Sequence, residues 1–294
     1  MRKNNKILTL IFSALFLFGL TFSAIAKEIH FFEVQNEFLN KINMLRANPT
    51  DVAEELGLDL SKINDKWKDK EIRENLSTLE LNEDLTKMAE EHIKEMVENG
   101  YIGHESEVGD TLEQRAEYFG YNGIFNGESI FVFCFENFVP FKKAKEILWS
   151  EIVKDALYGI SAEGAPLVFP FYRDLGVALG AGQITLDETT YNAYILCIEF
   201  GVPESVSGYI LGRIYEHTPL PEYGVSNVEI KGIQYNFYYS SHMGNIFLDG
   251  SFFIPWDGIS PMWLEIYEDP WLYPKKTALV LTPTVYIEIS QEDD

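Results

Sequence analysis

Amphipathic helical segments occur up to Val202-Pro203 and stop there, and this change of pattern constrains the fold more than any other feature. Before it, apolar residues recur at helical spacing in several segments, with strand-like runs between and after them. After it, short β-rich runs alternate with turn residues, which is typical of a small β-sandwich. The sequence therefore predicts an α+β protein in which residues 27–203 form a mixed domain and residues 204–294 form a small all-β sandwich domain.

Turn and cap residues set the expected limits of the elements. Asn48-Pro49 and Asn99-Gly100 end two long helices, Thr111 to Gln114 fits a capping box, and Phe141 to Tyr158 forms a third long helix. Lys62 to Glu74 is highly charged, and we expect a solvated connection there. Strands are expected at Ser129–Phe135, Leu175–Leu179, Thr190–Phe200, Gly208–Tyr215, Val225–Ile230, Tyr235–Ser240, Asn245–Leu248, Met262–Tyr267, Ala278–Leu281 and Val285–Ile289.

The N-terminus has the pattern of a secretory signal peptide. Three basic residues precede an apolar run from Ile7 to Phe22, and Ala24-Ile25-Ala26 matches a cleavage site. The alternative is an uncleaved membrane anchor, but a run of about 16 residues is short for a span. We therefore expect residues 1–26 to be removed after Ala26, leaving a secreted protein, extracellular or periplasmic, with no stable membrane anchor.

The charge of the chain excludes one class of partner. Lys and Arg number 23 against 46 Asp and Glu, a formal charge of −23. Neutralising a phosphate backbone needs clustered basic residues, and the densest cluster is Lys142, Lys143 and Lys145. We therefore expect no nucleic-acid partner.

The two cysteines, Cys134 and Cys197, both lie in strand-like apolar runs. An exported protein can join them in one disulfide, and two buried free thiols are an equal alternative. Their spacing offers no metal motif.

Few residues in the chain are placed to do chemistry. His104 follows Gly103 in a loop after a helix, where the backbone can aim a side chain into a cleft. Glu128 begins an apolar strand, and Glu151 shares a helical face with apolar residues, so each needs a partner, a ligand or access to solvent. His92 lies on an apolar helix face, which is more typical of a hydrogen-bonded core histidine than of a site.

Several short motifs follow one another in a set order over about 130 residues. They are Asn43-x-x-Arg46, the helix Leu79–Met96, Gly103-His104 with Gly109, Arg115 and Gly120-Tyr121, then Gly127-Glu128-Ser129-Ile130, Trp149-Ser150-Glu151 and Leu175-Gly176-Val177. In this order they resemble the CAP superfamily of cysteine-rich secretory, antigen 5 and pathogenesis-related proteins, in its bacterial form. The resemblance implies an α-β-α sandwich for the first domain.

The resemblance also implies a binding cleft. Members have two His and two Glu there, which in some hold a divalent cation. Carried over by motif, His104, Glu128 and Glu151 are the cleft residues and the metal-ligand candidates, and Glu163 stands where the second His is expected. One imidazole with three carboxylates is a harder donor set. The resemblance therefore implies a cleft able to hold a divalent cation (Zn, Mg, Mn or Ca) as a cofactor, and any zinc there should be held more weakly than in a two-His relative.

The function implied by the resemblance is binding without catalysis. Arg115, Tyr121 and Ser129 are expected to support the cleft. No G-x-S-x-G or H-E-x-x-H signature occurs, so no catalytic residue is assigned. The expected ligand is lipid-like or a host or envelope component. The alternative is a metal-dependent hydrolase or peptidase that uses the same cleft.

The second domain resembles transthyretin-like and carboxypeptidase-regulatory-like domains. The resemblance rests on Ser207-Gly208-Tyr209-Ile210, Val228-Glu229-Ile230 and the run Met243–Leu248. It implies a structural role or, as a further alternative, an adhesin-like one. We expect the tryptophans of this domain to lie in the core and at turns, and the alternative is that they form a sugar-stacking surface. They are Trp256, Trp263 and Trp271.

Overall fold

The structure, a computed structural model, describes residues 29–135, 137, 139–186, 189–217, 229–235, 239–267 and 276–290. The predicted leader lies outside the described residues. Within the described ranges, no helix has both the length and the apolar character needed to cross a bilayer.

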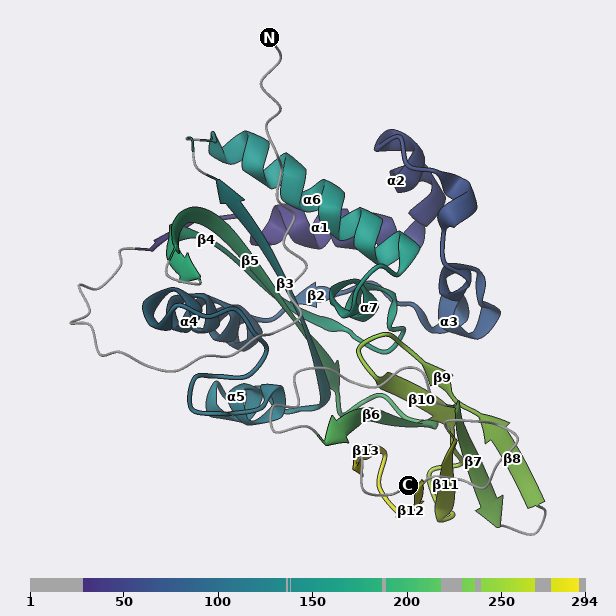
Figure 1. The fold of residues 1–294 in the computed structure, drawn as a ribbon. Helices are drawn as coiled ribbons and strands as arrows, with labels where there is room; N and C mark the ends of the chain where they lie inside the picture. Colours follow the sequence, from purple (N-terminus) through teal and green to yellow (C-terminus); the bar gives the residue numbers. More distant parts are fainter. Residues whose placement is uncertain are drawn as a thin grey trace.

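One sheet forms the centre of the first part (Figure 1). Its strand order is β1-β4-β5-β3, with the short β2 beside β4, so β3 lies at an edge. Every pair is antiparallel except β2 with β4. The strands are β1 (His30–Phe31), β2 (Glu80–Leu81), β3 (Gly123–Phe135), β4 (Asp174–Leu186) and β5 (Thr189–Pro203).

Helices cover both faces of this sheet, which confirms the predicted α-β-α sandwich (Figure 1). One face packs against α4 (Glu83–Asn99) and the neighbouring α5 (Leu112–Tyr118). The other packs against α1 (Gln35–Ala47), α2 (Pro49–Glu55), α6 (Phe141–Tyr158) and α7 (Ala165–Val168). The remaining helices are α3 (Lys70–Asn75) and 3₁₀ turns at Leu60–Lys62, Asp65–Lys68 and Ala162–Gly164.

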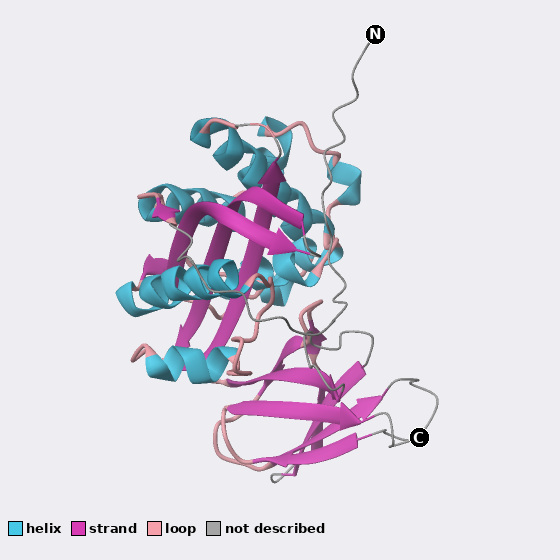
Figure 2. Ribbon diagram, turned by 60° about the vertical axis from the view of Figure 1, so that its left-hand side comes forward, coloured by secondary structure: helices cyan, strands magenta, loops and turns pink. Residues whose placement is uncertain are grey.

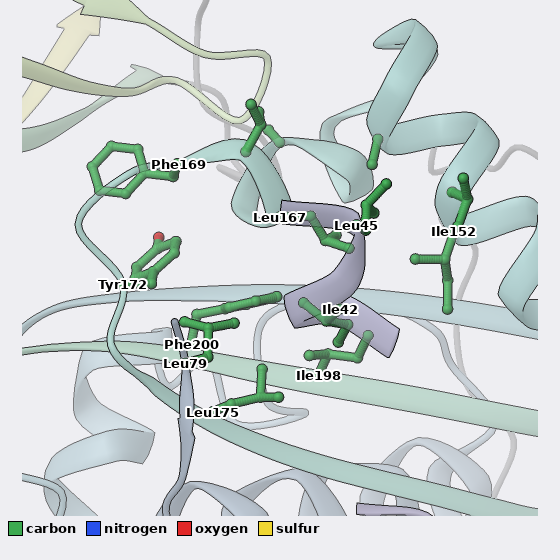
Figure 3. Close-up of a cluster of buried hydrophobic side chains, with 14 of the residues drawn as sticks. Ile42, Leu45, Leu79, Ile152, Leu167, Phe169, Tyr172, Leu175, Ile198 and Phe200 are labelled. Atoms are coloured by element: carbon green, nitrogen blue, oxygen red, sulfur yellow. The ribbon is translucent and has the colours of Figure 1, made fainter. Parts of the chain in front are cut away.

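The largest core lies between the sheet and α1 and α6. Ile42 and Leu45 of α1 pack over Ile198 and Phe200 of β5, and all four are 0% exposed (Figure 3). Ile152 of α6 closes the same cluster. Burying an apolar side chain contributes about 1.5–3 kcal/mol, so this face holds the helices that frame the site.

Caps fix the loop that carries His104. Gly100 ends α4 in the left-handed region at φ 73°, which a residue with a Cβ rarely adopts. Thr111 and Gln114 form the predicted capping box at the start of α5. The chain between the two helices is therefore short and held at both ends.

The second part is an all-β sandwich, as predicted (Figure 2). Its sheets have the orders β13-β6-β10-β9 and β12-β11-β7-β8, and β6 and β13 pair in parallel. One buried cluster takes Ile210, Phe252 and Ile254 from the first sheet and Leu264 and Ile266 from the second. The strands are β6 (Tyr209–His217), β7 (Glu229–Tyr235), β8 (Tyr239–Met243), β9 (Asn245–Ile246), β10 (Ser251–Pro255), β11 (Met262–Tyr267), β12 (Lys276–Val280) and β13 (Thr284–Ser290).

The strand predictions in this part were partly wrong. The central strand β10 was not predicted, because a short apolar run that ends in Pro255 has no alternating pattern. The strand predicted at Tyr235–Ser240 is instead the end of β7 and the start of β8. Of the strand predicted at Val225–Ile230, the first four residues lie outside the described ranges.

Two tryptophans of the sandwich are described. The Trp256 indole donates to the Ser260 carbonyl at 2.7 Å and anchors a turn. Trp263 is 43% exposed on β11. Trp271 lies outside the described residues.

The segment Lys62–Glu74 is not the solvated connection we expected. Trp67 is 2% exposed and Ile72 is 0% exposed, and the Trp67 indole donates to the Ala156 carbonyl at 2.7 Å. Two apolar anchors within a charged stretch are enough to bind it to the core.

The two parts of the chain lie against each other (Figure 2), and they share apolar contacts. Phe253 of β10 lies 5.1 Å from Phe171 and 6.3 Å from Phe169, ring centre to ring centre. Arg213 of β6 donates to the Asn126 carbonyl of β3 at 3.0 Å. The sandwich therefore packs directly on the first part.

Candidate functional site

His104 lies between two carboxylates at the edge of the sheet. Its Nδ1 is 2.7 Å from Glu128 Oε1, and its Nε2 is 2.7 Å from Glu163 Oε1. The carbonyl of Gly103 meets His92 Nε2 at 2.8 Å, which fixes the loop just before His104. Both ring nitrogens are thus engaged. We call His104, Glu128 and Glu163 the edge clasp.

Glu163 connects the clasp to the backbone of the edge strand. It lies in the 3₁₀ turn Ala162–Gly164, and its Oε2 accepts a hydrogen bond from the Ile130 amide of β3. The Ser129 hydroxyl donates to the Glu163 carbonyl at 2.7 Å. The clasp therefore reaches across β3, from the α4 side of the sheet to the α6 side.

Arg115 of α5 holds the inner end of the clasp. Its Nη2 donates to Glu128 Oε2 at 2.8 Å and to the His104 carbonyl at 2.9 Å. Its Nη1 lies 3.5 Å from Glu199 Oε1 on β5. Glu128 and Glu199 stand opposite each other in the β3–β5 register, so one guanidinium serves two adjacent carboxyl groups.

Burial divides the cluster into an outer and an inner end. The side chains of His104 and Glu163 are 23% and 20% exposed, whereas that of Glu128 is 1% exposed. A ligand from solvent therefore meets the His104–Glu163 pair first. Glu199 is 0% exposed, and its Oε2 has no hydrogen-bond partner among the described residues.

The contacts move the pKa values of three groups. Burial alone would lower the pKa of His104, but the charge of Glu163 and the hydrogen bond to Glu128 hold it well above its usual value. Burial would raise the pKa of Glu128, but Arg115 and the neighbouring imidazoles keep it well below its usual range. Burial and the Glu128 carboxylate raise the pKa of Glu199 well above its usual range. At neutral pH we therefore expect an imidazolium at His104 and a protonated Glu199.

The His104 donor set does not fit a divalent cation. A metal needs a neutral imidazole with a free lone pair, whereas both ring nitrogens here face carboxylates and the raised pKa favours the protonated ring. Binding would require His104 to lose a proton and at least one of these contacts.

A second group of donors lies deeper, and it does not fit a cation either. In the described part of the chain, the one group of three candidate ligands with donor atoms within 4.8 Å of one another is Glu128, Cys197 and Glu199. The Arg115 guanidinium already occupies this position between the two carboxyl groups. Burial raises the pKa of the Cys197 thiol well above its usual value, so the thiolate that a metal prefers is disfavoured.

The structure does not bring Glu151 to the clasp. Its side chain is 44% exposed on α6 and lies 3.9 Å from Lys154 Nζ, one turn along the same helix. The predicted convergence of Glu151 with His104 and Glu128 therefore does not describe this structure. The physical reason is that Glu151 stands at the edge of the apolar face, where it reaches solvent.

The other predicted residues divide between the clasp and the core. Arg115 and Ser129 contact the clasp directly. Tyr121 instead donates to Asp174 Oδ2 at 2.8 Å. The Tyr121 ring fills the space that a Cβ would need at Gly201, so its contacts are with the core. His92 is 2% exposed and hydrogen-bonded, as expected of a core histidine, and it also lies 3.7 Å from Glu128 Oε2.

Sequence reasoning missed Glu199 and Cys197 as members of the site. The available signal was a single carboxyl group inside the apolar run from Ala193 to Phe200, where an unpaired charge is costly. What the run could not show is the register that places Glu199 opposite Glu128. Both cysteines are free thiols and form no disulfide with each other; Cys197 is buried as the alternative expected, whereas Cys134 is half-buried.

Comparison with known proteins places this geometry in a family. The model of the CAP family, described as the cysteine-rich secretory protein family, matches residues 39–163, a span that begins in α1 and ends at Glu163. Among solved structures, the chain is similar to an extracellular protein containing an SCP domain from Bacillus anthracis strain Ames, at 19% identity and a TM-score of 0.31. That match covers 58% of this chain and 42% of the other. No curated protein sequence matches the chain. Residues 39–163 thus carry most of the motifs and the whole clasp, whereas β4 and β5 of the sandwich lie beyond them, and this part of the chain matches the CAP domain of the cysteine-rich secretory protein family.

Proposed function

We propose that this CAP-domain protein is exported and binds an extracellular ligand without turning it over. The observation that carries the proposal is the double engagement of His104, whose two ring nitrogens each lie 2.7 Å from a carboxylate. A general base needs a free lone pair, and an imidazolium clamped at both nitrogens has none. In this proposal the clasp fixes the shape of the cleft.

An apolar ligand is the class that the neighbouring surface favours. Phe131, Phe133 and Phe135 of β3 are each half-buried on the strand that the clasp crosses. Phe135 lies 5.3 Å from the Tyr194 ring, and Phe133 lies 5.9 Å from Phe135. Partly exposed aromatic side chains beside a polar anchor suit a lipid-like molecule or an apolar envelope component.

Native mass spectrometry and liposome binding test the proposal. We expect the exported protein to carry a co-purified apolar ligand or to bind liposomes, and Phe133→Ser to weaken that binding. Phe131 and Phe135 remain in this variant, so the strand keeps most of its apolar face. Absence of both ligand and liposome binding would contradict the proposal.

Calorimetry with zinc tests whether the clasp is a metal site. Because His104 must lose a proton first, we expect the wild-type protein to bind zinc weakly, and more weakly as the pH falls. Glu163→His supplies a second imidazole and should raise the affinity by roughly tenfold or more. Equal zinc affinities for the two proteins would contradict this account, as would tight zinc binding by the wild type.

The hydrolase alternative has a direct test in the same proteins. A slow hydrolytic activity that disappeared in His104→Ala and on chelation would support a metal-dependent enzyme and contradict our proposal. We expect no activity that depends on His104.

A further inference from the structure

A small pocket lies at the seam between the CAP domain and the β-sandwich, apart from the clasp. Its volume is about 130 Å³. Its walls come from three separate segments of the chain, and the lining residues used below are Lys66, Trp67, Ala165, Val168, Phe247 and Leu248. None of the three clasp residues lines it, although Gly164, directly after Glu163, does.

The walls are apolar and held in place by their own contacts. Trp67 is 2% exposed, and its indole is fixed by the hydrogen bond to the Ala156 carbonyl. Phe247 is 3% exposed and packs edge-on against Phe169, with ring centres 5.2 Å apart. Val168 is 5% exposed. Such a pocket is largely preformed and costs little to organise on binding.

One cation lines this apolar pocket. Lys66 Nζ lies 4.9 Å from the centre of the Phe247 ring and 3.4 Å from Asn245 Oδ1. Among the described residues, no carboxylate lies within 4.0 Å of it, whereas Lys68 pairs with Asp65 at 2.9 Å and Lys70 with Glu74 at 3.6 Å. Burial lowers the pKa of Lys66, and the charge of Asp69 opposes this only in part.

This arrangement is unusual in so acidic a chain. Asp and Glu outnumber Lys and Arg by 46 to 23, so a carboxylate partner is easy to supply. Lys66 is half-buried, and its partners among the described residues are an amide oxygen and a ring face, so the ammonium still has donor capacity. An anionic group in the pocket would complete it.

We propose that this pocket binds a small carboxylate with a compact apolar body, about the size of benzoate. The volume sets the size of the apolar body, because an apolar cavity of roughly 150 Å³ accepts benzene and this pocket of about 130 Å³ is close to it. The apolar body would lie against Trp67, Val168 and Phe247. The carboxylate would meet Lys66 Nζ at the edge of the pocket. This site is independent of the function proposed for the clasp.

Titration of the purified protein with sodium benzoate and with benzamide tests the proposal. The two probes share a ring and differ in charge, so we expect saturable benzoate binding and roughly tenfold or more weaker binding of benzamide. In ¹⁵N NMR spectra the indole signal of Trp67 should shift with benzoate. Lys66→Met should remove the preference for benzoate, and Lys68→Met, two residues away and exposed, should leave it unchanged.

Two further variants keep the outcome decisive. Ala165→Leu fills the pocket and should abolish binding of both probes, whereas His104→Gln should not alter benzoate affinity. Equal binding of benzoate and benzamide would overturn the proposal, as would an unmoved Trp67 signal or a loss of benzoate binding in His104→Gln. The comparison of probes on the wild-type protein decides the question even if Lys66→Met does not fold.

Discussion

The Glu128 carboxylate meets two imidazoles and one guanidinium from separate parts of the chain. His104 Nδ1 lies 2.7 Å away, Arg115 Nη2 lies 2.8 Å away and His92 Nε2 lies 3.7 Å away. Its neighbour Glu199 is in the opposite situation, because the same guanidinium lies 3.5 Å from it, farther than from Glu128. The two carboxyl groups therefore differ in their protonation state although they stand side by side.

Replacing each carboxyl group by an amide should separate these roles. Glu199→Gln resembles the protonated acid, so we expect it to change the unfolding free energy by less than about 1 kcal/mol. Glu128→Gln leaves Arg115 and His104 without their shared carboxylate and should cost about 3 kcal/mol or more. Urea denaturation at neutral pH measures both, and a larger loss for Glu199→Gln would contradict the assignment.

The stability of the protein should fall as the pH rises above neutral. The folded pKa of His104 is raised, so its contribution is complete below the unfolded pKa of about 6.5 and is lost as the pH rises through the folded pKa. In this window the unfolding free energy should fall by up to about 1.4 kcal/mol per pH unit. The difference between wild type and His104→Gln isolates the effect, and parallel pH profiles would refute it.

At the scale of elements, β3 is a long edge strand, and the backbone groups on its outer side have no neighbouring strand in the sheet, so another chain could pair with them. Glu163 occupies one outward amide, that of Ile130, and Ser129 fixes the turn that brings Glu163 there. Edge strands are commonly protected by such contacts. The clasp therefore stabilises this edge of the sheet.

Hydrogen exchange at Ile130 tests this role of Glu163. Glu163→Ala removes the acceptor, and we expect exchange of the Ile130 amide to accelerate by roughly tenfold, because a hydrogen bond contributes about 1–1.5 kcal/mol. Glu151→Ala is the matched control, because Glu151 is a half-exposed carboxylate on the neighbouring helix, and it should leave Ile130 unchanged. The same rate in both variants would show that Glu163 does not protect the strand.

The side chains of the motif residues Asn43 and Arg46 hydrogen-bond to the backbone of other segments of the chain. Arg46 is 4% exposed and donates to the carbonyls of Ser77 and Leu167 at 3.1 and 2.9 Å. Burial lowers its pKa to about 9. Asn43 exchanges two hydrogen bonds with the backbone of Leu79. Together they tie α1 to the segments that lead into β2 and β4.

Arg46→Met should therefore destabilise the fold by about 3 kcal/mol, because several buried carbonyls lose a charged donor. Arg73→Met is the control, since Arg73 is exposed on α3 and makes a single bond of 3.3 Å to the Trp67 carbonyl. Thermal and urea unfolding compare the two variants. Equal losses would mean that the burial of Arg46 does not matter.

Local patterns predicted the elements better than the contacts between them. The helix predicted from Phe141 to Tyr158 is α6 to the residue, because its periodicity lies within the segment and Gly159, directly after it, ends the helix in the left-handed region. The partner of His104 depends instead on a turn that lies 59 residues away along the chain. The family resemblance placed both Glu163 and Glu151 beside His104; the structure brings Glu163 there, whereas Glu151 is half-exposed on α6, as its position at the edge of the apolar face allows.

At the scale of the whole molecule, the CAP domain and the β-sandwich share a core. Phe247 and Phe253 of the sandwich pack against Phe169 and Phe171, and Arg213 joins β3 to Asp249. The change of pattern at Val202-Pro203 predicted two folded parts. It could not predict this contact, because apolar residues at a seam have the same pattern as residues in a core.

A shared core should make the two parts unfold together. Phe253→Ala should lower the stability of both by about 3–5 kcal/mol, with one transition seen by hydrogen exchange in α4 and in β11. Ile259→Ala, at an 88% exposed site of the sandwich, should have no such effect. If β11 were destabilised while α4 kept its protection, the parts would be independent.

The protonation state of His104 is the most direct test of the account. We predict that ¹⁵N NMR of the imidazole ring shows both nitrogens protonated at neutral pH. The titration of His104 should lie at a pH clearly above the ordinary histidine value of about 6.5. In Glu163→Gln it should return to a lower pH. A neutral ring with one bare nitrogen at pH 7 would contradict the clasp and would restore His104 as a free base or metal ligand.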